Sequence, residues 1–531
     1  MGIGVLEDGH LDRPPGTSKL GEEQGPGSDT ASTNALKKDG DIILVPQPSD
    51  SPNDPLNWSK TWKNAIMFVL AFSSGVTTSL GPMISPGLVI LSQEYKVAPD
   101  TVSAFMVGSI VLFTGSVTFF TASGANIWGK RPFFVISTLM LLASNVWGTF
   151  ADSFPSLAAM RIFQGISSAP LETLVTSTVS DLFFVHQRGF RLSMWGVMLS
   201  VGVLLGQIIA GFIIESLGIP GTFGISALIF CLILPAMYFL VVETTYTKPR
   251  NAARATSVEQ MVDEKGGGRE SWMELEDDPA NKTKESYSSQ LRLFRGRLSQ
   301  DSFWKGVLKP FPLICFPAVI FSTFVYASFF TWLLMIGVLS VSIFSAPPYN
   351  LSASQVGLTN VPLAIAALIF SPISGWMADA LPVWMAKRNN GVFEPEFRLV
   401  LMAIAVPLST AGFIGFGVSA SNGLPLPWCL VWITMHSIAV PFASQASISY
   451  VIDCHTKDAN QAFVTINFVK ALMSFVASTV GNRLLTKYGP KQLFIGIALL
   501  NLGISALTIP SYIYGKRLRS WVARSEWAQR I

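Results

Sequence analysis

Two charged residues inside one apolar stretch have the types and spacing to serve proton transport. Arg161 and Glu172 lie in the run from Arg161 to Gly189 and are 11 residues apart. On a helix this spacing is close to three turns, so both side chains share one face, about 16 Å apart. Intramembrane charges are costly and usually face the protein interior, a partner or a water-filled path. Glu172 is therefore our candidate proton carrier, and a structural ion pair with Arg161 or with a neighbouring span is the alternative.

Other polar residues within apolar runs extend this candidate site. His436 could couple protons, or it could be a hydrogen-bonded structural residue. Lys470 follows Asn467 by one helical turn, which predicts a polar stripe facing the interior. The charge of Lys470 could select anionic substrates or repel cations. Arg161 would tune Glu172 or contact substrate.

The seventh apolar segment, 312–337, is rich in aromatic residues. At helical spacing these rings could line an apolar cavity for flat ligands, or they could face lipid or pack within the protein. The aromatic residues are Phe316, Phe321, Phe324, Tyr326, Phe329, Phe330 and Trp332.

The composition predicts membrane-spanning helices as the elements that position these residues. Half of the 531 residues are hydrophobic and only 13% are charged. The charges gather at 1–63, 243–309 and 515–531, which leaves runs of the length of about 20 residues that a bilayer requires. The expected spans are 63–85, 102–122, 132–150, 157–180, 192–216, 221–242, 312–337, 355–378, 398–418, 426–450, 460–483 and 491–514.

This order predicts an all-α polytopic membrane protein with twelve transmembrane helices in two pseudo-symmetric six-helix halves. We expect a disordered cytoplasmic N-terminal tail, a cytoplasmic linker between the halves and a cytoplasmic C-terminal tail. The corresponding boundaries are 1–62 for the tail, 63–242 for the first half, 243–309 for the linker, 310–514 for the second half and 515–531 for the C-terminal tail.

Basic residues predict the orientation of the chain in the membrane. With both termini in the cytoplasm, the short inner loops hold most lysines and arginines, as the positive-inside rule requires. The exception is the outer loop near Lys487 and Lys491. The sequence Asn350-Leu-Ser352 then falls in an outer loop and could accept a glycan. The expected location is the plasma membrane, with a vacuolar membrane as the alternative.

One glycine-containing segment resembles a nucleotide-binding motif. Residues 124–131, GANIWGKR, nearly match the P-loop pattern. However, Arg131 stands where that pattern needs serine or threonine, and an apolar span follows instead of a nucleotide-domain helix. We therefore exclude nucleotide binding, and basic residues spread over the span ends give no reason to expect nucleic acid. The segment is interpreted as the cytoplasmic turn between spans two and three, where the basic residues could gate the transporter or simply anchor it.

The same turn carries a family resemblance. GKRP resembles the end of the G-x-x-x-D-R-x-G-R-R loop of the major facilitator superfamily, although Asn126 and Ile127 stand at the acid and arginine positions. A related loop follows span eight. In the family such loops form a gate ion network. The resemblance therefore implies gating roles for Gly129, Lys130 and Arg131 in the first loop and for Gly375, Asp379 and Arg388 in the second.

Two further motifs resemble antiporters of this family. RIFQG at residues 161–165 is similar to its fourth-span R-x-x-Q-G motif, which implies proton coupling through Arg161 and Gln164. In the fifth span, Gly202, Gly206 and Gly211 are spaced as in the family's antiporter signature. Small residues at this spacing also allow close helix packing, which is the alternative reading.

Shorter segments resemble one branch of the family, the fungal twelve-span drug:proton antiporters, which include polyamine, multidrug and secondary-metabolite carriers. These segments are DPLNW at 54–58, DLFFVHQRG at 181–189, ETTY at 243–246, EPEFRL at 394–399 and YVID at 450–453.

Residues and resemblance together favour a secondary active transporter rather than an enzyme. It would export small organic compounds by alternating access, in exchange for protons, and would act as a monomer in the lipid bilayer without a cofactor or a metal. Proton-coupled uptake remains open, because the motifs do not encode direction. A transport-silent sensor and a membrane enzyme are the alternatives from other classes.

Overall fold

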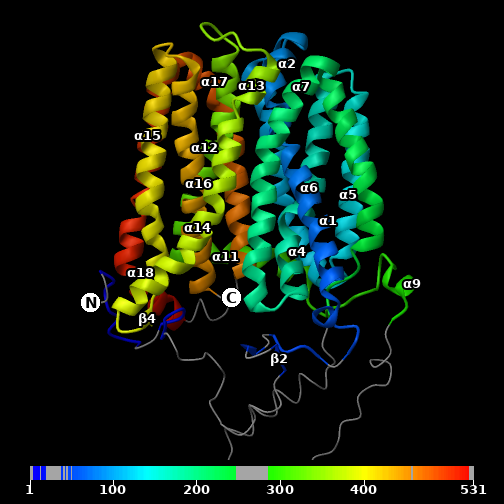
Figure 1. Ribbon diagram of the computed structural model, residues 1–531, viewed down its shortest axis with the longest axis vertical. Coiled ribbons are helices and arrows are strands. Elements are labelled where there is room, and N and C mark those ends of the chain that lie inside the picture. The colour runs from blue at the N-terminus through cyan, green and yellow to red at the C-terminus, as the bar shows by residue number, and fades with distance from the viewer. Residues whose placement is uncertain are drawn as a thin grey trace, which may run out of the picture.

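The computed structural model is an upright bundle of helices (Figure 1). It describes residues 4–11, 14–19, 37–39, 42–43, 46–49, 51–246, 285–455 and 459–525. Helices of the first half, blue to green, stand beside those of the second half, yellow to red (Figure 1). Strand β4 (Val392–Phe393) and helix α18 (Thr508–Arg524) lie at one end of the bundle, which we call the terminal end (Figure 1). The opposite end, which carries α2 and α13, is called the distal end.

The first half begins where Ser59 caps α1, its side chain accepting a hydrogen bond from the backbone N–H of Trp62. Pro132 stands in the first turn of α5, where a proline is well tolerated. The helices of this half are α1 (Lys60–Ser79), η2 (Pro82–Gly87), α2 (Leu88–Glu94), α3 (Pro99–Ser103), η3 (Ala104–Gly108), α4 (Ser109–Trp128), α5 (Arg131–Thr149), α6 (Phe154–Leu182) and α7 (Val185–Leu240).

The second half is preceded by short helices of the connector. In order these elements are α9 (Tyr287–Gln290), α10 (Phe303–Leu308), α11 (Pro310–Leu313), α12 (Pro317–Phe344), α13 (Ala353–Leu358), α14 (Val361–Arg388), η5 (Pro395–Leu401), α15 (Met402–Ser421), α16 (Leu426–Cys454), α17 (Ala459–Ser505) and α18 (Thr508–Arg524). Four two-residue strands, β1 (Ser18–Lys19), β2 (Lys38–Asp39), β3 (Ile42–Ile43) and β4 (Val392–Phe393), complete the described elements.

The described residues contain nine helical segments long and apolar enough to cross a membrane. Two of them, which include α7 and α17, each combine two spans, because Gly218 and Gly489 interrupt the helices with φ values of +71° and +73°. Such left-handed backbone is readily adopted by glycine. With α6, a further helix of 29 residues, the bundle has twelve spans. The expected all-α architecture of two six-helix halves is confirmed.

The two halves have separate apolar cores but touch along their length. One core cluster is formed almost entirely by residues of the first half, and two others are formed mainly by residues of the second half. Between the halves, α4 packs on α17 and α7 packs on α14. At the distal end the Asp100 carboxylate accepts a hydrogen bond from the Arg483 backbone N–H at 2.8 Å, and Glu215 accepts one from the Ser354 backbone N–H at 3.2 Å. The distal ends of the halves are thus joined in this structure.

At the terminal end the N-terminal segment lies against the second half, although the first half follows it in sequence. Strand β1 pairs antiparallel with β4. The Glu7 carboxylate pairs with Lys516 of α18 at 2.6 Å, and Val5 is buried. Of the connector predicted at 243–309, residues 247–284 lie outside the described residues. The division of the chain into tail, halves and linker therefore stays a prediction.

Candidate functional site

The expected proton carrier faces a charge from the other half of the bundle. Glu172 of α6 and Lys470 of α17 lie near enough for an electrostatic interaction, and both side chains are partly buried. In the described part of the chain, neither group forms an ion pair at contact distance. Glu172 does not pair with Arg161. The structure therefore brings together two of the predicted site residues that are far apart in sequence.

Two aromatic rings of α12 complete the surroundings of Lys470. Its Nζ atom lies 5.8 Å from the ring centre of Tyr326 and 5.5 Å from that of Phe330. These two rings are 4.6 Å apart between centres. Both distances from Nζ lie within the range of about 6 Å in which a cation is attracted to a ring face. We call Glu172, Lys470, Tyr326 and Phe330 the midplane cluster.

Close helix packing explains how Lys470 reaches the first half. The next residue, Ala471, lies against Gly115 of α4, where an added Cβ atom would come within 2.4 Å of the Ala471 Cβ. Only a glycine allows α17 to approach α4 this closely. On the predicted polar stripe of α17, the Asn467 side chain donates to the Phe463 carbonyl of its own helix. Ser474, one turn after Lys470, shares a hydrogen bond with Thr331 of α12 at 3.1 Å.

Arg161 is placed in a separate polar site inside the first half. Its Nη1 atom donates to the Leu80 carbonyl at 2.7 Å and to the Gln164 side-chain oxygen at 2.9 Å. Gln164 in turn donates to Asn145 at 3.1 Å. The guanidinium also lies 5.2 Å from the ring centre of Phe223. Arg161 is fully buried, and its Nε and Nη2 atoms have no hydrogen-bond partner among the described residues. A role of Arg161 and Gln164 in proton coupling stays a prediction.

His436 is enclosed within the second half. Its Nδ1 atom shares a hydrogen bond with the Ser409 hydroxyl at 2.9 Å, and Nε2 lies 3.3 Å from the Phe329 carbonyl. Asn501 donates to the same hydroxyl at 3.1 Å. The ring of Phe413 packs 4.4 Å away, centre to centre. These contacts support the hydrogen-bonded structural reading, while a coupling role remains untested.

The first predicted gating loop carries an ion pair and a helix cap. Lys130 pairs with Asp181, at the end of α6, at 2.5 Å. The Glu243 carboxylate accepts hydrogen bonds from the backbone N–H groups of Lys130 and Arg131 at 3.1 and 3.0 Å. A carboxylate is favoured there by the dipole of α5. Gly129 has a φ of +89°, and an added Cβ atom would lie 2.3 Å from Glu243.

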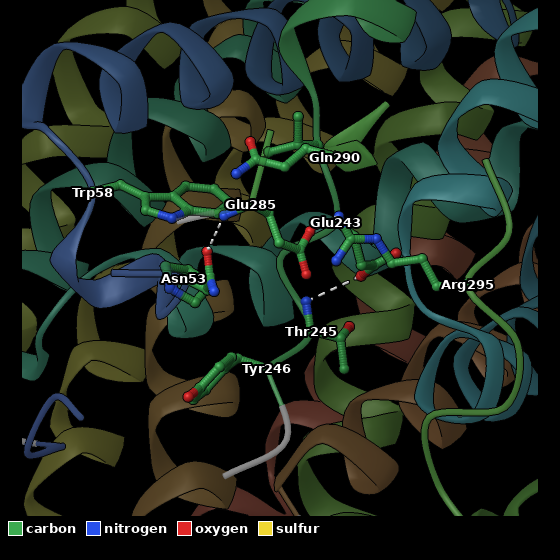
Figure 2. A pocket seen from close by; sticks show the side chains of 10 residues that line it. Asn53, Trp58, Glu243, Thr245, Tyr246, Glu285, Gln290 and Arg295 are labelled. Carbon is green, nitrogen blue, oxygen red and sulfur yellow. Dashed lines mark hydrogen bonds and ion pairs between the residues drawn. The ribbon is translucent and has the colours of Figure 1, made fainter. Parts of the chain in front are cut away.

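A polar cavity of about 140 Å³ lies next to this loop. Figure 2 shows residues from three separate parts of the chain that line it: the segment before α1, the segment just after α7 and the end of the connector at 285–295. The Asn53 side chain accepts a hydrogen bond from the Glu285 backbone N–H at 2.9 Å, and Arg295 pairs with Glu285 at the same distance. The first contact ties residues 285–295 of the connector to the segment before α1, and the second lies within the connector.

The second predicted gating loop forms its network through a residue outside the predicted set. Arg398 pairs with Asp453, at the end of α16, and lies 3.5 Å from the largely exposed Asp379 carboxylate. Arg388 instead stacks on Trp384 at 3.9 Å. Gly375 faces open space. The predicted set of gating residues thus did not include Arg398 and Asp453 in this loop, or Asp181 and Glu243 in the first loop. All four lie in the segments DLFFVHQRG, ETTY, EPEFRL and YVID that carry the family resemblance, which was the available signal.

The three antiporter-like glycines lie at close helix contacts. An added Cβ atom on Gly202 would come within 2.2 Å of the Gly75 carbonyl oxygen, and one on Gly206 within 2.6 Å of Ser79. Both contacts join α7 to α1. Gly211 approaches the Ala353 carbonyl of α13, in the other half, in the same way. This geometry supports the tight-packing reading.

Comparisons with known proteins agree with this architecture. The family model described as "Major Facilitator Superfamily" matches residues 66–478. An uncharacterized MFS-type transporter of Schizosaccharomyces pombe is 26% identical, with 97% of this chain and 94% of the relative covered. Protein HOL1 of Saccharomyces cerevisiae is 25% identical, with 97% of each chain covered.

A more distant relative and a solved structure extend the likeness. A trichosetin biosynthesis cluster MFS transporter of Gibberella fujikuroi is 21% identical, with 92% of this chain and 93% of the relative covered. The crystal structure of a D-xylose-proton symporter has the same fold, with a TM-score of 0.57, 13% identity and coverage of 87% of this chain and 99% of the symporter. The chain belongs to the major facilitator superfamily, a family of membrane transporters without enzymatic activity.

Proposed function

We propose that this transporter exports small organic compounds in exchange for protons, with Glu172 as the proton-carrying group. The observation that carries the proposal is the placement of Glu172 opposite Lys470. A carboxyl group on one half faces a cation on the other half, so its protonation changes the attraction between the parts that alternate access requires to move. Ion-coupled transporters place such groups near the bilayer midplane.

The terminal end is proposed to face the cytoplasm of the cell, across the plasma membrane. Several features support this orientation. The basic loop residues Lys130, Arg131, Arg188 and Arg398 all lie near that end, in agreement with the positive-inside rule. Asn350 would then lie outside. It is exposed in the loop after α12, which suits a glycan acceptor.

Proton-coupled uptake is the second candidate. The symporter that shares the fold is described as D-xylose-proton coupled, whereas the trichosetin-cluster relative belongs to a biosynthetic gene set. The comparisons therefore point to both directions of transport. Export is favoured by the antiporter-like spacing of Gly202, Gly206 and Gly211.

The test is a flux measurement on purified protein in liposomes with an imposed pH gradient. Candidate compounds are first selected by comparing the metabolites of medium and cells with and without the protein. We expect the wild type to move the selected compound in the direction opposite to the proton flow. Glu172→Gln should lose the dependence on the gradient, because the amide cannot carry a proton. Glu94→Gln, at an exposed carboxylate near the distal end, is the matched control and should behave as wild type. Equal gradient-driven flux in Glu172→Gln would refute the proton role, and the sign of the flux separates export from uptake.

A further inference from the structure

The neighbours of Lys470 all favour positive charge. The faces of the Tyr326 and Phe330 rings lie 5.8 and 5.5 Å from its ammonium group, and aromatic faces carry partial negative charge. Glu172, when ionised, adds a negative charge from the opposite half. Lys470 itself is the only positively charged group recorded in this cluster among the described residues.

The ammonium group is held only weakly in this position. In the described part of the chain, no hydrogen bond and no contact ion pair fixes it; its recorded interactions are those with the two rings and with Glu172. Lysine has a flexible stem of four carbons and a compact, strongly hydrated head. The side chain is also partly exposed. It can therefore withdraw from the rings without breaking a hydrogen bond.

We propose that Lys470 is a built-in occupant of a cation site, and that the transported compound carries a positively charged nitrogen group that displaces it. The inference rests on the proposed function, because it assigns a substrate class to the same midplane cluster. A cation that replaces the ammonium meets Glu172 and both ring faces. It also leaves the charge beside Glu172 unchanged.

An anionic substrate would meet a less favourable environment at the same place. It would gain the attraction of Lys470 but would face the Glu172 carboxylate and the negative faces of both rings. Like charges and ring faces repel an anion. In the sequence, the charge of Lys470 alone favoured anionic substrates, because its neighbours on α6 and α12 are distant in the chain and could not be recognised. The geometry points to the opposite preference.

A tethered occupant has a measurable consequence. Lys470 competes with the free cation at the high effective concentration of a linked group. Its removal should therefore tighten cation binding. If Lys470 gains about 1.4 kcal/mol from the rings and the carboxylate, within the usual range for cation–π contacts, the gain in affinity is about tenfold.

The probes are benzyltrimethylammonium and benzenesulfonate, two permanently charged ions of similar size and opposite sign. Equilibrium binding of each labelled ion is measured on the purified full-length protein at constant pH and without a gradient. Lys470→Met keeps the length of the side chain and removes the charge. We expect this variant to bind the cation about tenfold more tightly than wild type, and adding Tyr326→Leu and Phe330→Leu should reverse the gain.

The matched control is Lys487→Met. Lys487 also lies over an aromatic ring, 4.9 Å from the centre of the Tyr488 ring, but outside the midplane cluster. It should leave binding of both ions unchanged. Benzenesulfonate binding that is lost in Lys470→Met would overturn the inference in favour of an anion site. Unchanged cation affinity in Lys470→Met, or no binding of the cation to either protein, would also overturn it.

These results are independent of the proton test. Loss of cation preference with intact proton-driven flux removes the substrate class and leaves the proposed function. Intact cation preference with Glu172→Gln flux equal to wild type removes the proton role instead.

Discussion

Replacing Gly202 by alanine tests whether the antiporter-like glycines are needed for helix contact. The added Cβ atom would lie 2.2 Å from the Gly75 carbonyl oxygen and 2.8 Å from its carbonyl carbon, both in the backbone of α1. An ordinary contact of this kind needs more than 3 Å, and a backbone atom cannot rotate away as a side chain can. The helices α1 and α7 must therefore separate by about 1 Å along this contact.

The cost follows from a comparison within the same helix. Gly196 of α7 has no atom within 4 Å of an added Cβ, so Gly196→Ala gains only the helix propensity of alanine, about 1 kcal/mol. Gly202→Ala has the same gain but adds the cost of overpacking, about 1–3 kcal/mol. Because the propensity term is common to both, the two variants should differ in unfolding free energy by about 1–3 kcal/mol.

The assay is unfolding of each purified variant by sodium dodecyl sulfate in mixed micelles, followed by circular dichroism. Gly196→Ala should unfold at or above the wild-type detergent fraction, and Gly202→Ala below it. Equal stability of the two alanine variants would refute the argument that close approach at Gly202 decides the packing of α1 on α7. A loss of transport without a loss of stability would instead assign the glycine to the conformational cycle.

Three other predictions concern the terminal end and the outer loop. Arg519→Leu removes the ion-pair partner of Glu396, at 2.8 Å from its Nη2 atom, and one of the two partners of Glu394, which also pairs with Lys516 at 2.8 Å; breaking such a buried network should cost about 3–5 kcal/mol in the same unfolding assay. Glu243→Ala removes the acceptor for two backbone N–H groups at the start of α5 and should cost about 0.5–2 kcal/mol, measured in the same way. Asn350→Gln should abolish a glycosidase-sensitive shift of the expressed protein on a gel.

Each of these predictions has an outcome that contradicts it. For Arg519→Leu, the combined change with Glu396→Gln should recover most of the loss, because Glu394 keeps its ion pair with Lys516 and the Glu396 carboxylate no longer stays unpaired; an equal loss in the combined variant would refute the electrostatic cause. For Glu243, the isosteric Glu243→Gln should retain part of the cap, so a larger loss than with alanine would refute capping. A glycosidase-sensitive shift that persists in Asn350→Gln would place the glycan elsewhere.

The twelve spans were predictable because the bilayer restricts what the backbone can do. A spanning segment must satisfy its own hydrogen bonds, so length and apolar composition determine a helix. The interruptions of α7 and α17 were also visible, as Gly218 and Gly489 are each followed by a proline within two residues. The end of the last span differs: the apolar run continues to residue 514, but α17 ends at Ser505 and α18 begins at Thr508. Hydropathy reports composition and does not show where a helix turns.

The partners of the site residues could not be predicted in the same way. Helical spacing correctly places Arg161 and Glu172 on one helix. However, Arg161 binds Leu80, which lies 81 residues earlier in the chain, and Glu172 interacts with Lys470, which lies 298 residues later. Periodicity determines which face of a helix is polar, but not which helix meets that face or at what height. The register between helices depends on packing, such as that of Ala471 on Gly115, and this packing is not encoded at any one position.

The two loop networks repeat the same connection in each half, which separates their role from that of the midplane cluster. Lys130 joins the start of α5 to the end of α6 through Asp181, and Arg398 joins the segment before α15 to the end of α16 through Asp453. Each pair lies within its own half, so a rocking motion that keeps each half rigid leaves both pairs intact. Glu172 and Lys470 lie on different halves, as do Asp100 and Arg483 at the distal end. Such a motion must change these contacts. We therefore expect neutralising substitutions in the loop pairs to act mainly through the stability of one half, and substitutions in the midplane cluster to change the balance between the two orientations of the transporter.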